Sequence, residues 1–124
     1  MIDMRPDLRV HLIIQHVGFF REDGTRCYKT GPVYNVTNKG RSRAKTFKNK
    51  VYMRKQGETV WRFMGFDTCS LKPGETCSRV WAARNVWCPD RPGKVGFRVV
   101  VDGDNEVSET NEHNNMAEQF YGLP

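Results

Sequence analysis

The feature that most constrains this chain is an alternation of apolar and polar residues with a period of two. The clearest segment is KVGFRVVVD, in which every second residue from Val95 to Val101 is apolar. Because successive side chains of a β-strand point to opposite faces, this pattern predicts strands that bury one face. Such alternation, together with β-branched and aromatic runs, predicts seven strands and no helix. Their ranges are 9–15, 33–37, 46–55, 59–66, 76–83, 94–102 and 114–122.

Turn-forming sequences separate the predicted strands at intervals of roughly 8–12 residues. They include Asp23-Gly24, the KPGE run at 72–75 and RPG at 91–93, and these residue types favour tight turns. Seven short strands with this spacing predict an all-β antiparallel sandwich, although the spacing alone does not distinguish a sandwich from a barrel. A chain of 124 residues is long enough to bury a core, so we expect one domain over residues 1–124.

Charge is distributed unevenly along the chain. Residues 1–101 contain all 20 Lys and Arg and 8 acidic residues, whereas residues 102–124 contain 6 acidic residues and no base. The densest basic stretch, residues 39–55, has eight cations and no acid. The net charge of +6 therefore hides a basic body joined to an acidic segment.

No feature of the sequence indicates contact with the membrane interior. No run of about 18 apolar residues occurs, so we expect no membrane insertion. The first residues, MIDMRPDLRV, lack the apolar stretch of a signal peptide. If the protein is exported, we expect its leader to lie upstream of this sequence.

The cysteines give an indication of the compartment. There are four, Cys27, Cys69, Cys77 and Cys88. None belongs to a CxxC pair, which structural zinc sites usually require, so a metal site is disfavoured. An even number in a small domain favours two disulfides and an oxidising compartment, with reduced buried thiols as the alternative.

Topology suggests which cysteines pair. In a seven-stranded Greek-key sandwich, successive loops alternate between the two ends. The connections that carry Cys27 (residues 19–31) and Cys88 (residues 85–93) then share one end, and Cys69 and Cys77 flank a single turn. The favoured pairs are Cys27–Cys88 and Cys69–Cys77, with two other connectivities open. Each disulfide would contribute about 2–4 kcal/mol to stability.

Four short motifs occur in an order that points to a known family. They are PDL at 6–8, NKG at 38–40, LKPGET at 71–76 and VVVDGDNEVSETNEHNN at 99–115. Together they resemble the CARDB family, the cell-adhesion-related domain of bacterial and archaeal surface proteins. The resemblance covers about residues 6–120, which is the expected core of the domain.

The resemblance implies an immunoglobulin-like, seven-stranded antiparallel Greek-key β-sandwich. It implies a non-catalytic adhesion or spacer module of a larger exported prokaryotic protein, located at the cell surface or outside the cell. Its expected partners are a protein or glycan at a cell surface and other domains of the same chain. The cysteines depart from the family pattern, as do the long connection around Cys27 and the loop with Trp87 and Cys88.

The acidic segment raises the question of calcium binding. DGDNEVSETNEH begins like an EF-hand loop, but Val107 replaces the glycine and His113 the glutamate that such a loop requires. We expect no cofactor and interpret the segment as a loop whose side chains satisfy its own backbone. The residues of this structural motif are Asp102, Asn105, Glu109, Asn111, Glu112, Asn114 and Asn115. A Ca²⁺ site at Asp102, Asp104 and Glu109 stays open as an alternative.

The basic stretch provides a second functional hypothesis. Arg41, Arg43 and Lys45 could contact an anionic polysaccharide or a protein partner. Aromatic residues nearby, Phe47, Tyr52 and Trp61, offer stacking surfaces, and Trp87 in its loop is a further candidate contact. Strand alternation places half of the cations on each face, so an ordinary solvated strand is the competing interpretation.

Two classes of function are disfavoured. No RRM, KH, zinc-finger or helix-turn-helix signature occurs, so nucleic acid is not an expected partner. The three histidines are scattered and belong to no catalytic motif, so we expect no enzyme activity. Of the three tryptophans, at least one should lie in the core, as in other sandwiches of this kind.

Overall fold

The computed structural model describes residues 4–81, 85–88, 93–102 and 115–123, and all of its regular structure is β-strand. Each of the seven predicted strand segments lies within or overlaps an observed strand. The strands are β1 (Leu8–Phe20), β2 (Arg26–Asn38), β3 (Ala44–Lys55), β4 (Arg62–Leu71), β5 (Thr76–Val80), β6 (Asn85–Trp87), β7 (Gly93–Val101) and β8 (Met116–Leu123). The described part of the chain contains no helix that could cross a membrane.

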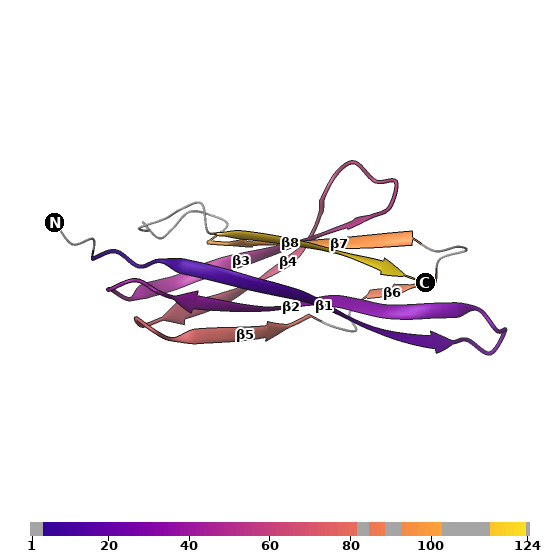
Figure 1. The fold of residues 1–124 in the computed structure, drawn as a ribbon, viewed down its shortest axis with the longest axis horizontal. Helices are drawn as coiled ribbons and strands as arrows, with labels where there is room; N and C mark the ends of the chain where they lie inside the picture. Colours follow the sequence, from indigo (N-terminus) through magenta and orange to yellow (C-terminus); the bar gives the residue numbers. More distant parts are fainter. Residues whose placement is uncertain (1–3, 82–84, 89–92, 103–114, 124) are drawn as a thin grey trace.

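The strands form two antiparallel sheets packed face to face (Figure 1). One sheet has the order β1-β2-β5, and β6 also pairs with β2; the other has the order β4-β3-β7-β8. Because β5 and β6 pair with successive stretches of β2 in the same direction, they form one interrupted strand. The fold is therefore the predicted immunoglobulin-like sandwich, with its fifth strand in two pieces.

The first two strands form a hairpin that is much longer than the sequence pattern indicates. Its register runs from Leu8 opposite Asn38 to Phe20 opposite Arg26, and a short turn at Asp23-Gly24 joins the strands. Cys27 therefore lies in β2 and not in a long connection, which corrects the prediction. The reason is burial: Cys27, Tyr28 and Thr30 are almost fully buried, and burying them requires a paired backbone.

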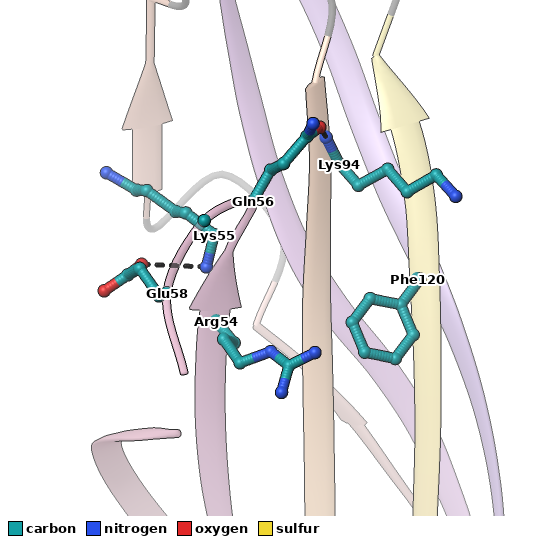
Figure 2. Close-up of a pocket in the computed structure, with 7 residues that line it drawn as sticks. Arg54, Lys55, Gln56, Glu58, Lys94 and Phe120 are labelled. Atoms are coloured by element: carbon teal, nitrogen blue, oxygen red, sulfur yellow. Dashed lines mark hydrogen bonds between the residues drawn. The ribbon is translucent and has the colours of Figure 1, made fainter. Parts of the chain in front are cut away.

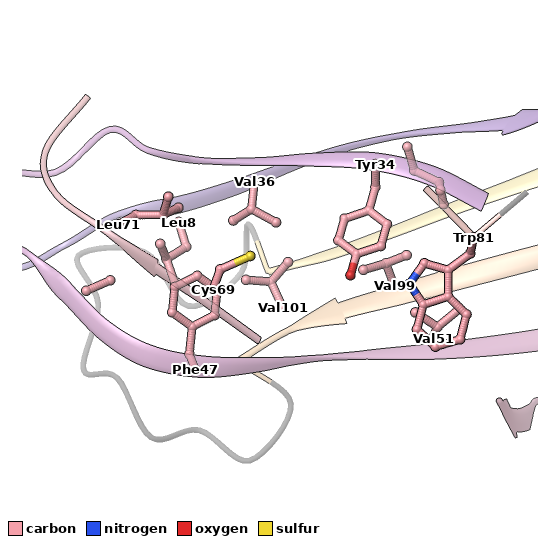
Figure 3. Close-up of a cluster of buried hydrophobic side chains, with 12 residues drawn as sticks. Leu8, Tyr34, Val36, Phe47, Val51, Cys69, Leu71, Trp81, Val99 and Val101 are labelled. Carbon is pink, nitrogen blue, oxygen red and sulfur yellow. The ribbon is translucent and has the colours of Figure 1, made fainter. Parts of the chain in front are cut away.

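The core lies between the sheets and is filled from both (Figure 3). The predicted inward face of β7 is confirmed, because Val95, Phe97, Val99 and Val101 are each at most 1% exposed. Trp81 is buried, which confirms the prediction that at least one tryptophan lies in the core. The main cluster comprises Leu8, Leu12, Tyr34, Val36, Ala44, Phe47, Val51, Cys69, Leu71, Trp81, Val99 and Val101.

A carboxylate between the sheets adds a polar cross-link to this core. The Oδ2 atom of Asp67 accepts hydrogen bonds from the Tyr34 hydroxyl (2.5 Å) and the Trp81 indole N–H (2.8 Å). Its Oδ1 atom accepts one from Asn49 Nδ2 (3.0 Å), and Arg79 lies 3.9 Å away. Burial of the Tyr34 phenol, followed by this bond to a carboxylate, raises the pKa of Tyr34 well above its usual value.

A β-bulge in β4 decides which of its side chains face outward. Tyr52 pairs with Phe63 and Val51 with Gly65, so Met64 is an extra residue on that strand. Gly65 has a φ of 143° there, close to the Trp81 ring. Met64 packs against the core, while Phe63 and Phe66 are both exposed. The bulge thus places two phenylalanines, three positions apart, on the same face.

Candidate functional site

The outer face of the β4-β3-β7-β8 sheet combines aromatic and cationic side chains. In one row across the strands, Tyr52 lies between Phe63 and Arg98, and the Tyr52 and Phe63 rings are 5.6 Å apart. In the next row, Lys50 lies between Phe66 and Val100. We use "outer face" for the following outward residues: Lys50, Tyr52, Arg54, Phe63, Phe66, Arg98, Met116, Glu118 and Phe120.

Trp61 crosses this face to reach the far edge of the sheet. It immediately precedes β4, at one edge, yet its ring lies 5.7 Å from that of Phe120 on β8, at the other edge. The guanidinium of Arg54 lies 5.2 Å from the Trp61 ring and 5.4 Å from the Phe120 ring, and that of Arg98 lies 4.6 Å from Trp61. These cation–π contacts hold the two arginine heads at fixed positions on the surface.

The ring of Phe120 lies directly against Gly96 of the neighbouring strand β7. A Cβ atom added to Gly96, its cross-strand partner on β7, would lie 2.5 Å from the Phe120 ring. The absence of a side chain at Gly96 therefore lets the ring lie flat on the strand, while 47% of Phe120 stays exposed. The result is a held aromatic surface that solvent can reach.

A hollow of about 160 Å³ adjoins this ring (Figure 2). Arg54 and Phe120 point toward each other across β7, and Lys94 and Gln56 close one end. We call this the Phe120 hollow; its lining residues are Arg54, Lys55, Gln56, Gly57, Glu58, Lys94 and Phe120. Its volume is below the range of about 300–1,000 Å³ for sites that enclose a ligand, so the hollow can take only part of a ligand.

The hollow has three cations and one carboxylate. Glu58 accepts a hydrogen bond from the Lys55 backbone N–H (2.8 Å) and another from Arg62 Nε (2.6 Å). These bonds, the backbone bond first, lower the pKa of Glu58, so its carboxylate stays ionised and turned toward those partners. The net charge of the lining is positive, because three cations accompany one carboxylate.

The structure does not bring the predicted basic contacts together with aromatic rings. Arg41, Arg43 and Lys45 are exposed near the start of β3, where Arg43 bonds the hydroxyl of Ser70 (3.4 Å). Phe47, expected to offer a stacking surface, is fully buried in the core. The other expected rings lie toward the opposite end of β3. The cation–aromatic site is thus formed by residues 54–61, 94–98 and 118–120.

The two predicted disulfide pairs are both present. Cys27–Cys88 joins β2 to the residue after β6, and Cys69–Cys77 joins β4 to β5, which belong to different sheets. Trp87 is not in a loop, because it pairs with Tyr28 as the last residue of β6. The Cys27–Cys88 disulfide lies next to this pair and ties the end of β6 to β2.

The acidic segment is described at its two ends. Asp102 is 4% exposed with a φ of 54°, a left-handed geometry that aspartate tolerates better than most residues. The backbone N–H of Val101 donates to the carbonyl of Asn115 (2.6 Å) and closes the base of the connection. Five members of the predicted motif, Asn105, Glu109, Asn111, Glu112 and Asn114, lie outside the described residues, as does Asp104.

Metal ligands are sparse where the structure describes the chain. Within residues 4–81, 85–88, 93–102 and 115–123, no three His, Cys, Asp or Glu residues come together as a metal centre would require. Asp104 and Glu109, the other two ligands of the alternative Ca²⁺ site, lie outside the described residues, so the site stays a prediction.

The Asn38 amide explains three of the sequence motifs. Its Oδ1 atom accepts the backbone N–H groups of Gly40 (2.9 Å) and Asp7 (3.2 Å). Its Nδ2 atom donates to the carbonyls of Ser42 (2.8 Å) and Leu71 (3.2 Å). Asn38 is completely buried, so these four bonds fully occupy it. The PDL, NKG and LKPGET segments meet at this side chain and serve the fold.

The sequence model of the CARDB family matches residues 5–119 of this chain. The chain belongs to the CARDB family. Three of the four sequence motifs of this CARDB domain are thus accounted for by the Asn38 end of the sandwich. No curated protein matches the chain significantly.

A solved structure supports the same assignment. It is the CARDB domain of a Pyrococcus furiosus protein in complex with di-metal ions. It is 25% identical to this CARDB domain, and the match covers 97% of this chain and 90% of that one with a TM-score of 0.65. The two domains share their fold along nearly their whole length.

Sequence reasoning missed Arg54, Lys94 and Phe120 as a group. A signal was present, because the basic stretch at 39–55 continues past Arg43 to Arg54. What the sequence does not reveal is the path of Trp61 over the sheet and the approach of β8 to β7 at Gly96. Those depend on sheet order, which joins residues far apart in the chain.

Proposed function

We propose that this CARDB domain is a non-catalytic adhesion or spacer module of a larger exported protein, working outside the cell or at its surface. The family is adhesion-related, and both disulfides suit an oxidising compartment. The module acts by keeping its shape between neighbouring parts of the same protein and by presenting side chains on a rigid sheet.

The observation that carries this proposal is the position of the outermost strands. β1 begins at one end of the sandwich and β8 ends at the other (Figure 1). A pull on the two ends of the chain therefore runs along the strands. It loads the ladders between β1 and β2 and between β7 and β8 in shear, where many hydrogen bonds share the force. Modules joined in this way would extend in a line.

The disulfides strengthen this arrangement. Cys69–Cys77 ties the two sheets together, and its loop lies inside the 61-residue loop that Cys27–Cys88 closes. Force applied to the ends cannot extend the chain between Cys27 and Cys88 while that bond is intact. The domain therefore limits its own extension even when it unfolds.

Two measurements test this proposal. Intact native cells are treated with a membrane-impermeant lysine reagent, and the protein is then alkylated at harvest without reductant. We expect surface labelling and no alkylated cysteine. Four alkylated thiols on an unlabelled protein would show that it resides in a reducing compartment and would overturn the proposal.

The mechanical part is tested by pulling single molecules of a tandem repeat of the domain. We expect each unfolding step to lengthen when reductant opens the disulfides, by about 20 nm for the 61 residues released at roughly 3.4 Å each. Equal step lengths with and without reductant would contradict the role of Cys27–Cys88 as a limit on extension.

A second proposal concerns metal. The Pyrococcus furiosus domain was solved with di-metal ions, whereas no three His, Cys, Asp or Glu residues come together within the described residues of this chain. We propose that this domain folds without bound metal through its disulfides and its Asn38 contacts.

A further inference from the structure

We propose that the Phe120 hollow and the outer face beside it bind an acidic polysaccharide, with a pyranose ring stacked on Phe120 and its anionic group held by Arg54 and Lys94. This inference names the partner of the adhesion module, and so it rests on the proposed function. The ligand chemistry is a sugar ring that carries a carboxylate or a sulfate.

The charge of the hollow favours an anion. Arg54, Lys55 and Lys94 line it, and its carboxylate, Glu58, is directed to the Lys55 backbone and to Arg62. An anionic group entering the hollow would therefore meet cations without a competing acid. Charge-assisted hydrogen bonds of this kind are about twice as strong as neutral ones.

The aromatic wall favours a ring over a bare ion. Phe120 is nearly half exposed and is held flat by contact with Gly96. The negative face of an aromatic ring attracts the slightly positive C–H groups of a sugar, and a rigid ring loses little entropy on binding. Arg54, already stacked between Trp61 and Phe120, is positioned to reach the charged substituent of that sugar.

The outer face continues the same chemistry beyond the hollow, which favours a polymer. Outward side chains recur along a strand about every 6.8 Å. The next row toward the centre of the sheet holds Arg98, Tyr52 and Phe63. The row after it holds Lys50 and Phe66. A sugar chain lying on the sheet would meet a cation and a ring in each row, with Arg98 also paired to Glu118 of its own row (Nε–Oε1 2.7 Å).

Other occupants match the face less well. A second copy of this chain would present the same cations, and like charges across an interface oppose association. The centres of protein interfaces are depleted of charged residues, whereas Lys50, Arg54 and Arg98 lie in the middle of this face. An acidic polypeptide would satisfy the cations but would leave the Phe120 ring without a stacking partner.

The test measures binding of the purified, oxidised domain at low ionic strength by isothermal titration calorimetry. The probes are polygalacturonate (carboxylate on a pyranose), dextran sulfate (sulfate on a pyranose), neutral dextran, and polyglutamate (carboxylate without a sugar ring). We expect polygalacturonate or dextran sulfate to bind about tenfold more tightly than polyglutamate, because stacking adds to charge pairing. Neutral dextran should bind more weakly than either acidic glycan, and which acidic glycan binds better identifies the anion.

Matched variants locate the site. Phe120→Ala and the double variant Arg54→Gln/Lys94→Gln should each weaken glycan binding about tenfold. Phe120→Tyr keeps a ring and should retain binding. Arg41→Gln/Arg43→Gln removes the same charge at the other end of the sandwich and should change affinity less than about twofold. Thermal melting of each variant shows whether it is folded, and Phe120→Tyr keeps the ring's role testable if Phe120→Ala unfolds.

Several outcomes would overturn the proposal. Polyglutamate binding as tightly as the glycans would indicate charge alone and an acidic protein partner. Equal losses in the two double variants would indicate the overall charge of the domain. Self-association in light scattering that Phe120→Ala abolishes would assign the face to a second copy. Absence of binding to both acidic glycans would also overturn it. That result would not touch the proposed surface location, which the labelling test decides separately.

Discussion

The two ends of the sandwich use polar residues for opposite purposes. At the Asn38 end, an amide with no exposure is bonded to four backbone groups from three segments of the chain. At the Phe120 hollow, Arg54 and Lys94 turn their charges toward solvent beside a half-exposed ring. Three of the four sequence motifs therefore maintain the shape of the domain, and Arg54, Lys94 and Phe120 lie outside all four motifs.

Strand β3 connects the two regions and shows the same division within one element. Its inward residues, Phe47, Asn49 and Val51, are fully buried. Its outward residues, such as Lys50 and Tyr52, belong to the outer face. A basic sequence stretch can thus be a core strand on one side and a cationic, aromatic surface on the other. Substitutions at the two ends should accordingly affect different properties.

The largest effect is expected for Asn38→Ala. The substitution removes four hydrogen bonds and leaves buried backbone groups without partners, so the free energy of unfolding should fall by about 3 kcal/mol or more. Urea unfolding measures this. Asn35→Ala is the matched control in the same strand, since Asn35 is exposed and bonds Ser78 at the surface. It should cost less than about 0.5 kcal/mol, and similar losses in both variants would refute the special role of Asn38.

The next largest difference in stability is expected between alanine substitutions at two glycines, Gly40 and Gly122, at opposite ends of the sandwich. A Cβ atom at Gly40 would lie 2.4 Å from the Arg5 carbonyl oxygen and 2.5 Å from the Asp7 nitrogen, which are backbone atoms that cannot rotate away. Gly40→Ala should therefore destabilise the domain by about 2 kcal/mol. Gly122→Ala, at the far end of β8, meets nothing within 4 Å. It should be neutral or stabilising by up to about 1 kcal/mol, and a loss equal to that of Gly40→Ala would remove the distinction between the ends.

The Asp67 network between the ends should give a smaller effect that depends on pH. Because the pKa of Tyr34 is raised in the folded state, its stabilising contribution is complete below about pH 10, where the unfolded phenol ionises. Above that pH the unfolded state loses its proton first, and stability falls as pH rises. Tyr34→Phe should cost about 1–2 kcal/mol at neutral pH, because Asp67 loses a donor.

The pH dependence of unfolding distinguishes the effect of the Tyr34 hydroxyl from the effect of packing of its ring. Urea unfolding between neutral pH and pH 11 should show a decline that is less steep in Tyr34→Phe, by up to about 1.4 kcal/mol per pH unit above pH 10. If wild type and variant declined in parallel, Tyr34 would titrate normally and the network would contribute through packing alone.

The sequence predicted what depends on local patterning. The inward face of β7 follows from strict alternation between Val95 and Val101. Cys69–Cys77 follows from the single turn between the two cysteines, and Cys27–Cys88 was predicted correctly although Cys27 lies in a strand and not in a loop. What it did not predict depends on contacts between distant segments. The extra residue at Met64 reverses the alternation in β4, and no local pattern distinguishes it.

The candidate site was predicted less well than the fold for the same reason. Arg41 and Arg43 stand out in the sequence because cations cluster there, but a cluster along one strand does not show which rings lie beside it. Phe120 becomes part of a site because Gly96 lies beneath it and Trp61 reaches it from the opposite edge of the sheet. Those pairs are 24 and 59 residues apart in the chain, so spacing carries no information about them.

The smallest effect is expected for Ca²⁺. Asp102 is buried at the base of the acidic segment, where its left-handed backbone closes the connection, and no described cluster of ligands accompanies it. A ligand that binds the native state at one hundred times its dissociation constant adds about 2.7 kcal/mol of stability. We expect far less, so that millimolar Ca²⁺ raises the melting temperature by less than about 2 °C relative to EDTA.

The control for this prediction distinguishes a structural Asp102 from a metal ligand. Asp102→Asn keeps the size of the side chain and tolerates the same left-handed backbone. If the segment is held by its own hydrogen bonds, the variant should show the same small response to Ca²⁺ as the wild type. A rise of many degrees that Asp102→Asn abolishes would mean that this end of the sandwich also binds a ligand. The division between a structural end and a binding end would then no longer hold.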